Sequence, residues 1–149
     1  MLPKSSRRVG EVIKLANTVA REYEQEYVGT EHVLIAILRE GSGIGAKVLA
    51  KRGVTAENLR AQVDQLVKKQ LEETWVFGRL PGTPHFKNVV ATAIEQCQKL
   101  GSKEVCTEHL LLALVKERGS IARKALNAIG LSFDDIRSDV VELTAAPPA

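Results

Sequence analysis

The sequence predicts an all-α protein built from two tandem four-helix units that are related by a pseudo-two-fold axis. An ungapped repeat is the first observation, because the segment Thr30–Leu38 recurs 77 positions later as Thr107–Val115. Apolar residues in both copies follow i, i+3, i+4 spacing, the period of a helix that buries one face. Aromatic residues are only 4% of the chain, and such a composition favours helices over strands.

The repeat also predicts the domain organisation. Repeat one spans about residues 5–70 and repeat two about 83–143, with a joint at about 71–82 and a disordered tail at 144–149. A unit of roughly 70 residues buries too little apolar surface to be stable by itself. We therefore expect the two repeats to pack into one domain that covers residues 1–149.

Helix start signals define the first two helices of repeat one. Ser5 or Ser6 is expected to cap a helix that runs to about Glu24, because a hydroxyl accepts from a free N–H of the first turn. Thr30 is expected to cap the second helix, and Thr107 its copy in repeat two. This second helix is apolar on nearly all sides, which predicts burial on most sides.

Two shorter amphipathic segments complete repeat one. One follows Gly41-Ser42-Gly43 and ends at Gly53, a typical helix C-terminal residue. The next begins at Thr55 and fades out near Gln70. Repeat two has the same plan and starts at Thr83-Pro84, since proline is favoured in the first helical turn.

Composition and charge exclude several classes of function. A net charge of +3, with one small basic cluster of Lys4, Arg7 and Arg8, is too weak for a nucleic-acid interface. No apolar run is long enough to span a membrane, and no signal-peptide pattern opens the chain. Cys97 and Cys106 lie outside any CxxC pattern, so reduced thiols and a cytoplasmic location are expected.

The repeated Glu-His pair raises the alternative of a metal-dependent hydrolase. Glu31-His32 and Glu108-His109 together supply two carboxylates and two imidazoles. Neighbouring helical residues point about 100° apart, however, and helical metal motifs use i, i+3 or i, i+4 spacing. With no phosphate-binding loop or nucleophile elbow either, we expect no enzyme activity, metal or cofactor. The two glutamates are then either dipole partners of their helices or the acids of two ligand sites.

Five segments carry a family resemblance: Tyr27–Leu34, Leu38–Gly41 and Ala46–Leu49 in repeat one, together with Thr83-Pro84 and Thr107–Leu112. They resemble the N-terminal domain of the Clp/Hsp100 AAA+ unfoldases, with ClpC as the nearest likeness. The resemblance implies the double four-helix Clp repeat fold. It also implies docking of adaptor and substrate proteins for an ATP-driven unfoldase that feeds a peptidase. The chain would then be either a domain of such an unfoldase or a stand-alone regulator that docks on a Clp complex, so its AAA+ modules would act in cis or in trans.

The resemblance further implies two phosphoarginine sites. Residues carried over from the family are Ser6 with Glu31 for one site and Thr83 with Glu108 for the other. The carboxylate would pair with the guanidinium portion, and the hydroxyl and helix N–H groups with the phosphate. This sequence departs from the family at Cys106, where glycine is usual, and at His85, where arginine is common.

Overall fold

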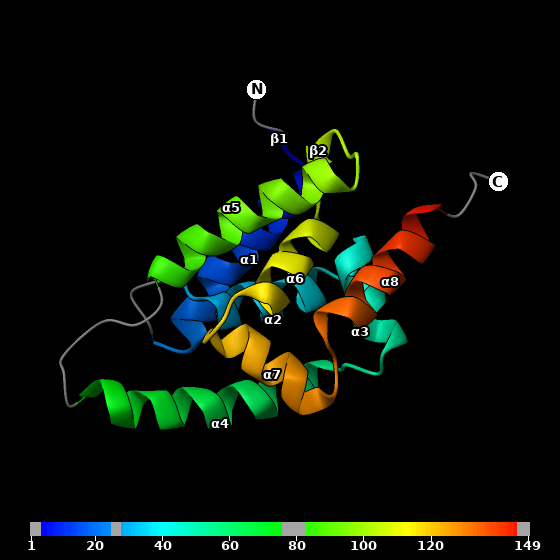
Figure 1. The fold of residues 1–149 in the computed structure, drawn as a ribbon. Coiled ribbons are helices and arrows are strands. Elements are labelled where there is room, and N and C mark those ends of the chain that lie inside the picture. The colour runs from blue at the N-terminus through cyan, green and yellow to red at the C-terminus, as the bar shows by residue number, and fades with distance from the viewer. Residues whose placement is uncertain (1–3, 25–27, 76–82, 146–149) are drawn as a thin grey trace.

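The computed structural model describes residues 4–24, 28–75 and 83–145, and for residues 67–75, 83–87 and 145 it describes only the backbone. These residues form eight helices and one pair of very short strands (Figure 1). In chain order the elements are β1 (Lys4–Ser5), α1 (Arg7–Glu22), α2 (Thr30–Glu40), α3 (Ile44–Lys51), α4 (Ala56–Trp75), α5 (Thr83–Lys99), β2 (Glu104–Val105), α6 (Thr107–Lys116), α7 (Ile121–Ile129) and α8 (Phe133–Ala145). The prediction of two four-helix repeats is confirmed.

Helices α2 and α6 form the centre of the molecule. Val33–Ile37 of α2 and Leu110–Val115 of α6 are buried at every position rather than on one face. The cause is that α2 contacts α1, α3 and α4 of its own repeat and α5, α6 and α7 of the other. A helix that is covered on all sides needs apolar residues all round, which explains the unbroken apolar run in each copy.

The last helix of each repeat packs across the repeat boundary. Helix α4 of repeat one contacts α7 of repeat two, and α8 of repeat two contacts α3 of repeat one (Figure 1). Leu49 of α3, Leu126 of α7 and Ile136 of α8 are fully buried as a result. Each repeat therefore completes the core of the other, as expected for units that are too small to be stable alone.

The repeated threonines also connect the two repeats. Thr107 Oγ1 accepts a hydrogen bond of 3.0 Å from the backbone N–H of Gly45, in the first turn of α3. Its counterpart Thr30 Oγ1 accepts one of 3.4 Å from the N–H of Ala122, in the first turn of α7. The first N–H groups of a helix lack a partner within that helix, so each threonine satisfies a helix of the opposite repeat.

The prediction that Thr30 and Thr107 cap their own helices is wrong. The N-cap residues are Gly29 and Cys106, both with extended backbone, and each threonine is the first helical residue. The prediction of a cap at Ser6 is confirmed, since its hydroxyl accepts from Val9 N at 3.3 Å. Helix α4 does not fade near residue 70 but continues to Trp75. Of the predicted tail at 144–149, residues 144 and 145 belong to α8, and the rest lies outside the described residues.

Two short strands, which the sequence did not predict, tie the start of the chain to repeat two. β1 pairs with β2 in parallel, with Lys4 opposite Glu104 and Ser5 opposite Val105. The N–H of Ser6 then donates to Val105 O at 2.8 Å. This pairing fixes the beginning of α1 beside the beginning of α6.

A charged cluster between α3 and α8 is a further link between the repeats. The guanidinium of Arg52 contacts both carboxylate oxygens of Asp139, at 2.6 and 3.0 Å. Lys51 lies 3.5 Å from Asp139 and 3.0 Å from Glu142. The Asp139 side chain is only 4% exposed, so its carboxylate is the buried partner of these ion pairs. Removing the cation that pairs with a buried carboxylate destabilises a fold.

Candidate functional site

The Thr-Glu-His motif occupies the first turn of both central helices, and its histidine has a structural role. His32 Nδ1 accepts a hydrogen bond of 2.9 Å from the backbone N–H of Gly29. His109 Nδ1 accepts one of 2.8 Å from the N–H of Cys106. Each histidine therefore does what a glutamate or glutamine does at the third position of a capping box, which is to reach back to the N-cap N–H.

This role requires neutral imidazoles. Burial lowers the pKa of His32 to about 4 and lowers the pKa of His109 as well, because a buried site disfavours the charged form. Within residues 4–24, 28–75 and 83–145, no group of three or more His, Cys, Asp and Glu side chains is arranged to hold a metal ion. The geometry of these residues thus gives no support to the metal-dependent hydrolase hypothesis.

The two glutamates of the motif are buried acids at helix N-termini. Glu31 is 3% exposed and Glu108 is 6% exposed. Burial raises the pKa of Glu108, while its own backbone N–H and the charge of Arg8 act in the opposite direction. A carboxylate at such a position is stabilised by the helix dipole and the free N–H groups but has lost most of its hydration. A cationic group placed beside such a carboxylate would favour its charged form.

The structure places Ser6 at the start of α6, the helix that carries Glu108, rather than beside Glu31. Ser6 is joined to repeat two through Val105 O, and its hydroxyl hydrogen-bonds the Cys106 sulfur and lowers the pKa of that thiol. Helices α1 and α2 are joined by a short connection and pack against each other. They run antiparallel, because Arg8 near the start of α1 donates a hydrogen bond to Ser42, beyond the end of α2.

Glu31 lies at the opposite end of α2 from that contact. Its charge acts on Tyr23, the C-cap residue of α1. The ends of an 11-residue helix are roughly 15 Å apart. The predicted pairing of Ser6 with Glu31 is therefore wrong.

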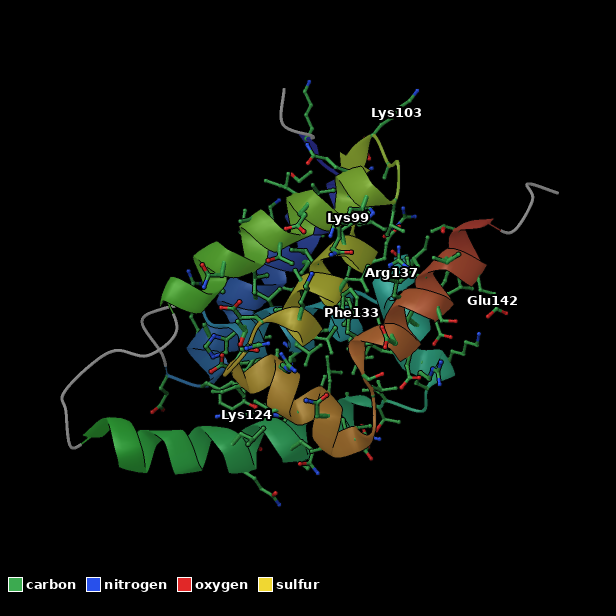
Figure 2. All side chains as sticks on the ribbon, in the orientation of Figure 1. Lys99, Lys103, Lys124, Phe133, Arg137 and Glu142 are labelled. Carbon is green, nitrogen blue, oxygen red and sulfur yellow. The ribbon has the colours of Figure 1, made fainter. Side chains whose placement is uncertain are left out.

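We call Ser6, Arg8, Cys106 and Glu108 the Glu108 cluster. It takes its hydroxyl and its guanidinium from the start of α1, and its carboxylate and its thiol from the start of α6. Lys4, Arg7 and Lys103, all exposed, lie near these residues in the chain, and Figure 2 shows Lys103 projecting outward beside β2. The cluster thus combines one buried acid with a basic surround.

Arg8 holds a fixed position in this cluster. Its Nε donates to Ser42 Oγ at 3.0 Å, and Ser42 in turn hydrogen-bonds the carboxylate of Glu40. The charge of Arg8 contributes to lowering the pKa of Glu40, and it also acts on Glu108. The guanidinium therefore lies between the end of α2 and the start of α6.

The second predicted pair is only partly described. Thr83 is the first residue of α5, but its side chain, like that of His85, lies outside the described residues. Helix α5 contacts α2 as well as α6. At the Glu31 end, Tyr23 hydrogen-bonds Asp64 and its ring lies 5.7 Å from that of His32.

Sequence reasoning missed Arg8 and Cys106 as members of a site. In the sequence, Arg8 stands out only as part of a small basic cluster, and Cys106 only as a departure from glycine. A signal was nevertheless present, because two helices joined by a short loop run antiparallel, so the start of α1 cannot lie beside the start of α2. A hydroxyl at the start of α1 is then far from the acid at the start of α2 in its own repeat.

A separate hollow lies on the surface of α8. It is lined by Asp134, Arg137, Ser138 and Val141, and Figure 2 shows Arg137 on this helix. Val141 is one of the exposed large apolar residues, at 42% exposure. None of the predicted site residues lines the hollow.

The fold defines the class of this protein: a domain made of two interlocked helical repeats. Comparison with protein families gives the same result, because the model of the Clp repeat (R) N-terminal domain matches residues 4–129 and again residues 82–149. The chain belongs to the Clp repeat N-terminal domain family. No helix of the described residues is long and apolar enough to cross a bilayer.

Relatives of known name are much longer than this chain. The chain is 33% identical over 143 residues to the negative regulator of genetic competence ClpC/MecB of Bacillus subtilis, covering 96% of this chain and 17% of that protein. It is also 33% identical over 143 residues to the ATP-dependent Clp protease ATP-binding subunit ClpA homolog of Guillardia theta, with the same coverage. The chain thus spans about one-sixth of the length of these relatives.

Solved structures share the fold at low identity. The N-terminal domain of ClpD from Arabidopsis thaliana matches with a TM-score of 0.69 at 15% identity, covering 96% of both chains. The Hsp104 N-terminal domain from Candida albicans matches with a TM-score of 0.66 at 16% identity, covering 97% of this chain and 93% of that one.

Proposed function

We propose that this chain is a substrate- and adaptor-recognition domain of a ClpC-type, ATP-driven unfoldase system. The family membership and the likeness to ClpC/MecB over 143 residues support this proposal. A domain of this kind needs a surface that captures a mark or a partner and needs no catalytic group of its own.

We further propose that the Glu108 cluster binds a phosphorylated arginine side chain. The observation that supports this most directly is that Ser6, Arg8 and Glu108 lie around the same helix start, that of α6. The guanidinium portion of phosphoarginine pairs with the buried carboxylate of Glu108 in a bidentate manner. Its phosphate accepts from the Ser6 hydroxyl, from the first N–H groups of α6 and from Arg8. The exposed lysines and arginines near the cluster attract the anionic group.

The repeat gives a counterpart of the Glu108 cluster, with pairs that differ from the two predicted ones. Applying the 77-residue offset to Ser6, Arg8 and Glu108 gives Thr83, His85 and Glu31. The second set therefore has a histidine where the Glu108 cluster has an arginine, and histidine lacks the permanent charge of arginine. We propose that phosphoarginine binds more tightly at the Glu108 cluster than at the site formed by Thr83 and Glu31.

Titration calorimetry tests this proposal directly. The wild-type chain is titrated with a short phosphoarginine peptide, with the arginine peptide as the unmodified control. We expect Glu108→Gln to weaken the tighter site by about tenfold or more, since a hydrogen bond to a charged group contributes roughly 1.5–3 kcal/mol. Ser6→Ala should weaken it less.

A matched control comes from the other repeat. Glu31→Gln alters the same motif at the equivalent helix start and should leave the tighter site intact while removing the weaker one. Absence of phosphoarginine binding to the wild-type chain would overturn the ligand assignment. Tighter binding in Glu108→Gln than in Glu31→Gln would overturn the ranking of the two sites.

A hybrid unfoldase tests the recognition role apart from the ligand. This chain replaces the N-terminal domain of the Bacillus subtilis relative, and degradation of a substrate that depends on an adaptor is then measured with the matching peptidase. We expect degradation above that of the unfoldase with no N-terminal domain. Equal rates for the two would contradict the recognition role.

A further inference from the structure

The two cysteines of the chain lie together, with Cys97 next to the Cys106 of the Glu108 cluster. The thiol of Cys97, in the last turns of α5, points at Glu104 O at 3.2 Å and at Ser102 O at 3.4 Å. The thiol of Cys106, the N-cap residue of α6, points at the same Glu104 O at 3.6 Å. Two thiols that share one acceptor oxygen are close neighbours. The pair is specific to repeat two, because repeat one has alanine and glycine at the equivalent positions 20 and 29.

The two thiols differ in access to solvent. Cys97 is fully buried, whereas Cys106 is partly exposed at the start of α6. The chain between them is a short loop that contains Gly101 in the left-handed conformation, with φ of 70°, and the two-residue strand β2. Because the two sulfurs lie 3.2 and 3.6 Å from the same carbonyl oxygen, they are at most 6.8 Å (3.2 + 3.6) apart, and a disulfide between them requires the Cβ atoms to come within about 4 Å.

We propose that Cys97 and Cys106 are a redox pair that a peroxide converts into an intramolecular disulfide. The accessible Cys106 sulfur attacks the peroxide, so that an S–O bond forms, the O–O bond breaks and one water leaves. The Cys97 sulfur then attacks the resulting sulfenic acid, so that the S–S bond forms, the S–O bond breaks and a second water leaves. Two thiols and one hydrogen peroxide thus give one disulfide and two waters.

The surroundings of the two thiols slow their reaction with peroxide at neutral pH. Burial raises the pKa of Cys97, and burial followed by the charge of Glu108 raises the pKa of Cys106. Glu104 acts on Cys106 in the same direction, while the hydrogen bond with Ser6 lowers its pKa. Because the thiolate is the nucleophile, the reaction is slow at neutral pH and accelerates as the pH rises.

Oxidation changes the Glu108 cluster and should therefore change its affinity for phosphoarginine, an expectation that rests on the proposed function. The disulfide moves the Cys106 sulfur toward α5 and removes it from its hydrogen bond with Ser6. It also displaces the N-cap residue of the helix that carries Glu108. We expect the oxidised chain to bind a phosphoarginine peptide about fivefold or more weakly than the reduced chain.

Peptide mapping under non-reducing conditions tests the redox pair without any ligand. The reduced wild-type chain is treated with hydrogen peroxide, remaining thiols are alkylated, and the digest is analysed by mass spectrometry. We expect one peptide pair joined through Cys97 and Cys106, lighter by two hydrogen atoms and formed within the monomer. Two alkylated thiols, sulfinic acid at Cys106 without a disulfide, or disulfides between molecules only would each overturn the proposal.

Two variants assign the roles of the sulfurs. Cys97→Ala removes the resolving thiol, so Cys106 should remain a sulfenic acid that a dimedone probe labels. Cys106→Gly copies Gly29, the N-cap residue of α2, and should leave Cys97 reduced at the same peroxide dose. Labelling of Cys97 in that variant would contradict the order of the two steps.

A binding measurement separates this inference from the proposed function. Phosphoarginine affinity is measured for the reduced and the oxidised wild-type chain, and for Cys106→Gly with and without peroxide. A fall in affinity in the wild type alone supports the effect on the cluster, whereas equal affinities overturn it. If the reduced chain binds no phosphoarginine, the proposed ligand fails, and peptide mapping still decides whether the redox pair exists.

Discussion

Thr107 accepts a hydrogen bond of 3.0 Å from the backbone of Gly45, a residue of the other repeat. Helix α3 has Gly43 as its N-cap, and glycine provides no side chain to cap the helix. The hydroxyl of Thr107 therefore does the capping for α3, from the first turn of α6. The motif that marks the repeat in the sequence thus holds the two repeats together in the structure.

Replacing Thr107 by valine should destabilise the domain by about 1–2 kcal/mol, the range for a lost helix cap. Thr107→Ser keeps the hydroxyl and should cost much less. Thr30→Val should cost less than Thr107→Val, because its bond is longer, at 3.4 Å, and α7 already has Ser120 as a side-chain cap. Urea unfolding measures all three, and a larger cost for Thr30→Val would contradict the assignment.

Gly45→Ala should destabilise the domain by about 1–3 kcal/mol, although alanine is the better helix former. A Cβ at this position would lie 2.9 Å from Thr107 O and 3.1 Å from a methyl carbon of Ile37. Gly10, inside α1, is a matched control, because a Cβ there meets nothing within 4 Å. Gly10→Ala should stabilise by about 0.5–1 kcal/mol, and thermal unfolding of the two variants compares the opposite signs.

Stability should fall as the pH falls from about 6.5 to about 4 through the titration of His32. Its pKa is about 4 in the folded chain against an ordinary value of 6.5, so between these values the unfolded chain binds more protons. The loss is on the order of 3 kcal/mol at most and is complete below pH 4.

His32→Gln tests this pH dependence. Glutamine keeps an acceptor for the N–H of Gly29 but does not titrate, so the curve of unfolding free energy against pH should flatten in that window. His32→Leu should be less stable at every pH, because it leaves that N–H without its acceptor. An unchanged slope in His32→Gln would contradict the prediction.

Arg52→Met should destabilise the domain by about 1–3 kcal/mol at pH 7, because it leaves the buried Asp139 with only Lys51. The hydrogen bond from Arg52 is the main cause that lowers the pKa of Asp139 below its ordinary 3.8. The pair therefore stabilises the fold above that pH, and its contribution is lost as the pH falls through the lowered value.

Arg39 provides the matched control for Arg52. It contacts both carboxylate oxygens of Glu22, at 2.8 and 3.1 Å, but both side chains are about one-third exposed. Arg39→Met should cost about 0–1 kcal/mol, as for most surface pairs. Similar costs for the two variants in chemical unfolding at pH 7 would contradict the importance of burying Asp139.

Glu108→Gln should raise stability while it weakens ligand binding. Burial raises the pKa of Glu108, which means that the fold accommodates the neutral side chain better than the charged one. We expect a gain of about 0.5–2 kcal/mol at pH 7, the usual range where a functional site is relieved of strain or charge. A loss of stability in thermal unfolding would contradict this prediction.

The helices and their order followed from the sequence because helix signals are local. Apolar spacing, the cap at Ser6 and the stop at Gly53 depend on residues within one or two turns, and the 77-residue repeat doubled each signal. The length of α4 was missed, because Lys68 to Trp75 has no apolar stripe that marks an end. Continued helix there reflects good helix formers such as leucine, lysine and glutamate.

The contacts between repeats were not predictable from local signals. Thr30 and Thr107 look like ordinary caps in sequence, and only the packing of α3 against α6 and of α2 against α7 shows that they serve the opposite repeat. The strands β1 and β2 are two residues long and give no periodic pattern. Ser6 and Glu108 were each predicted as site residues, but their meeting depends on that strand pair and on the antiparallel course of α1 and α2.

The strand pair has a consequence for how the chain is made. Lys4 and Ser5 pair with Glu104 and Val105, so the first described residues wait for a partner that leaves the ribosome about a hundred residues later. Closing so long a loop is slow compared with forming a helix. The start of α1 remains without its strand partner until about a hundred further residues have been made, and a chain interrupted after repeat one never acquires it.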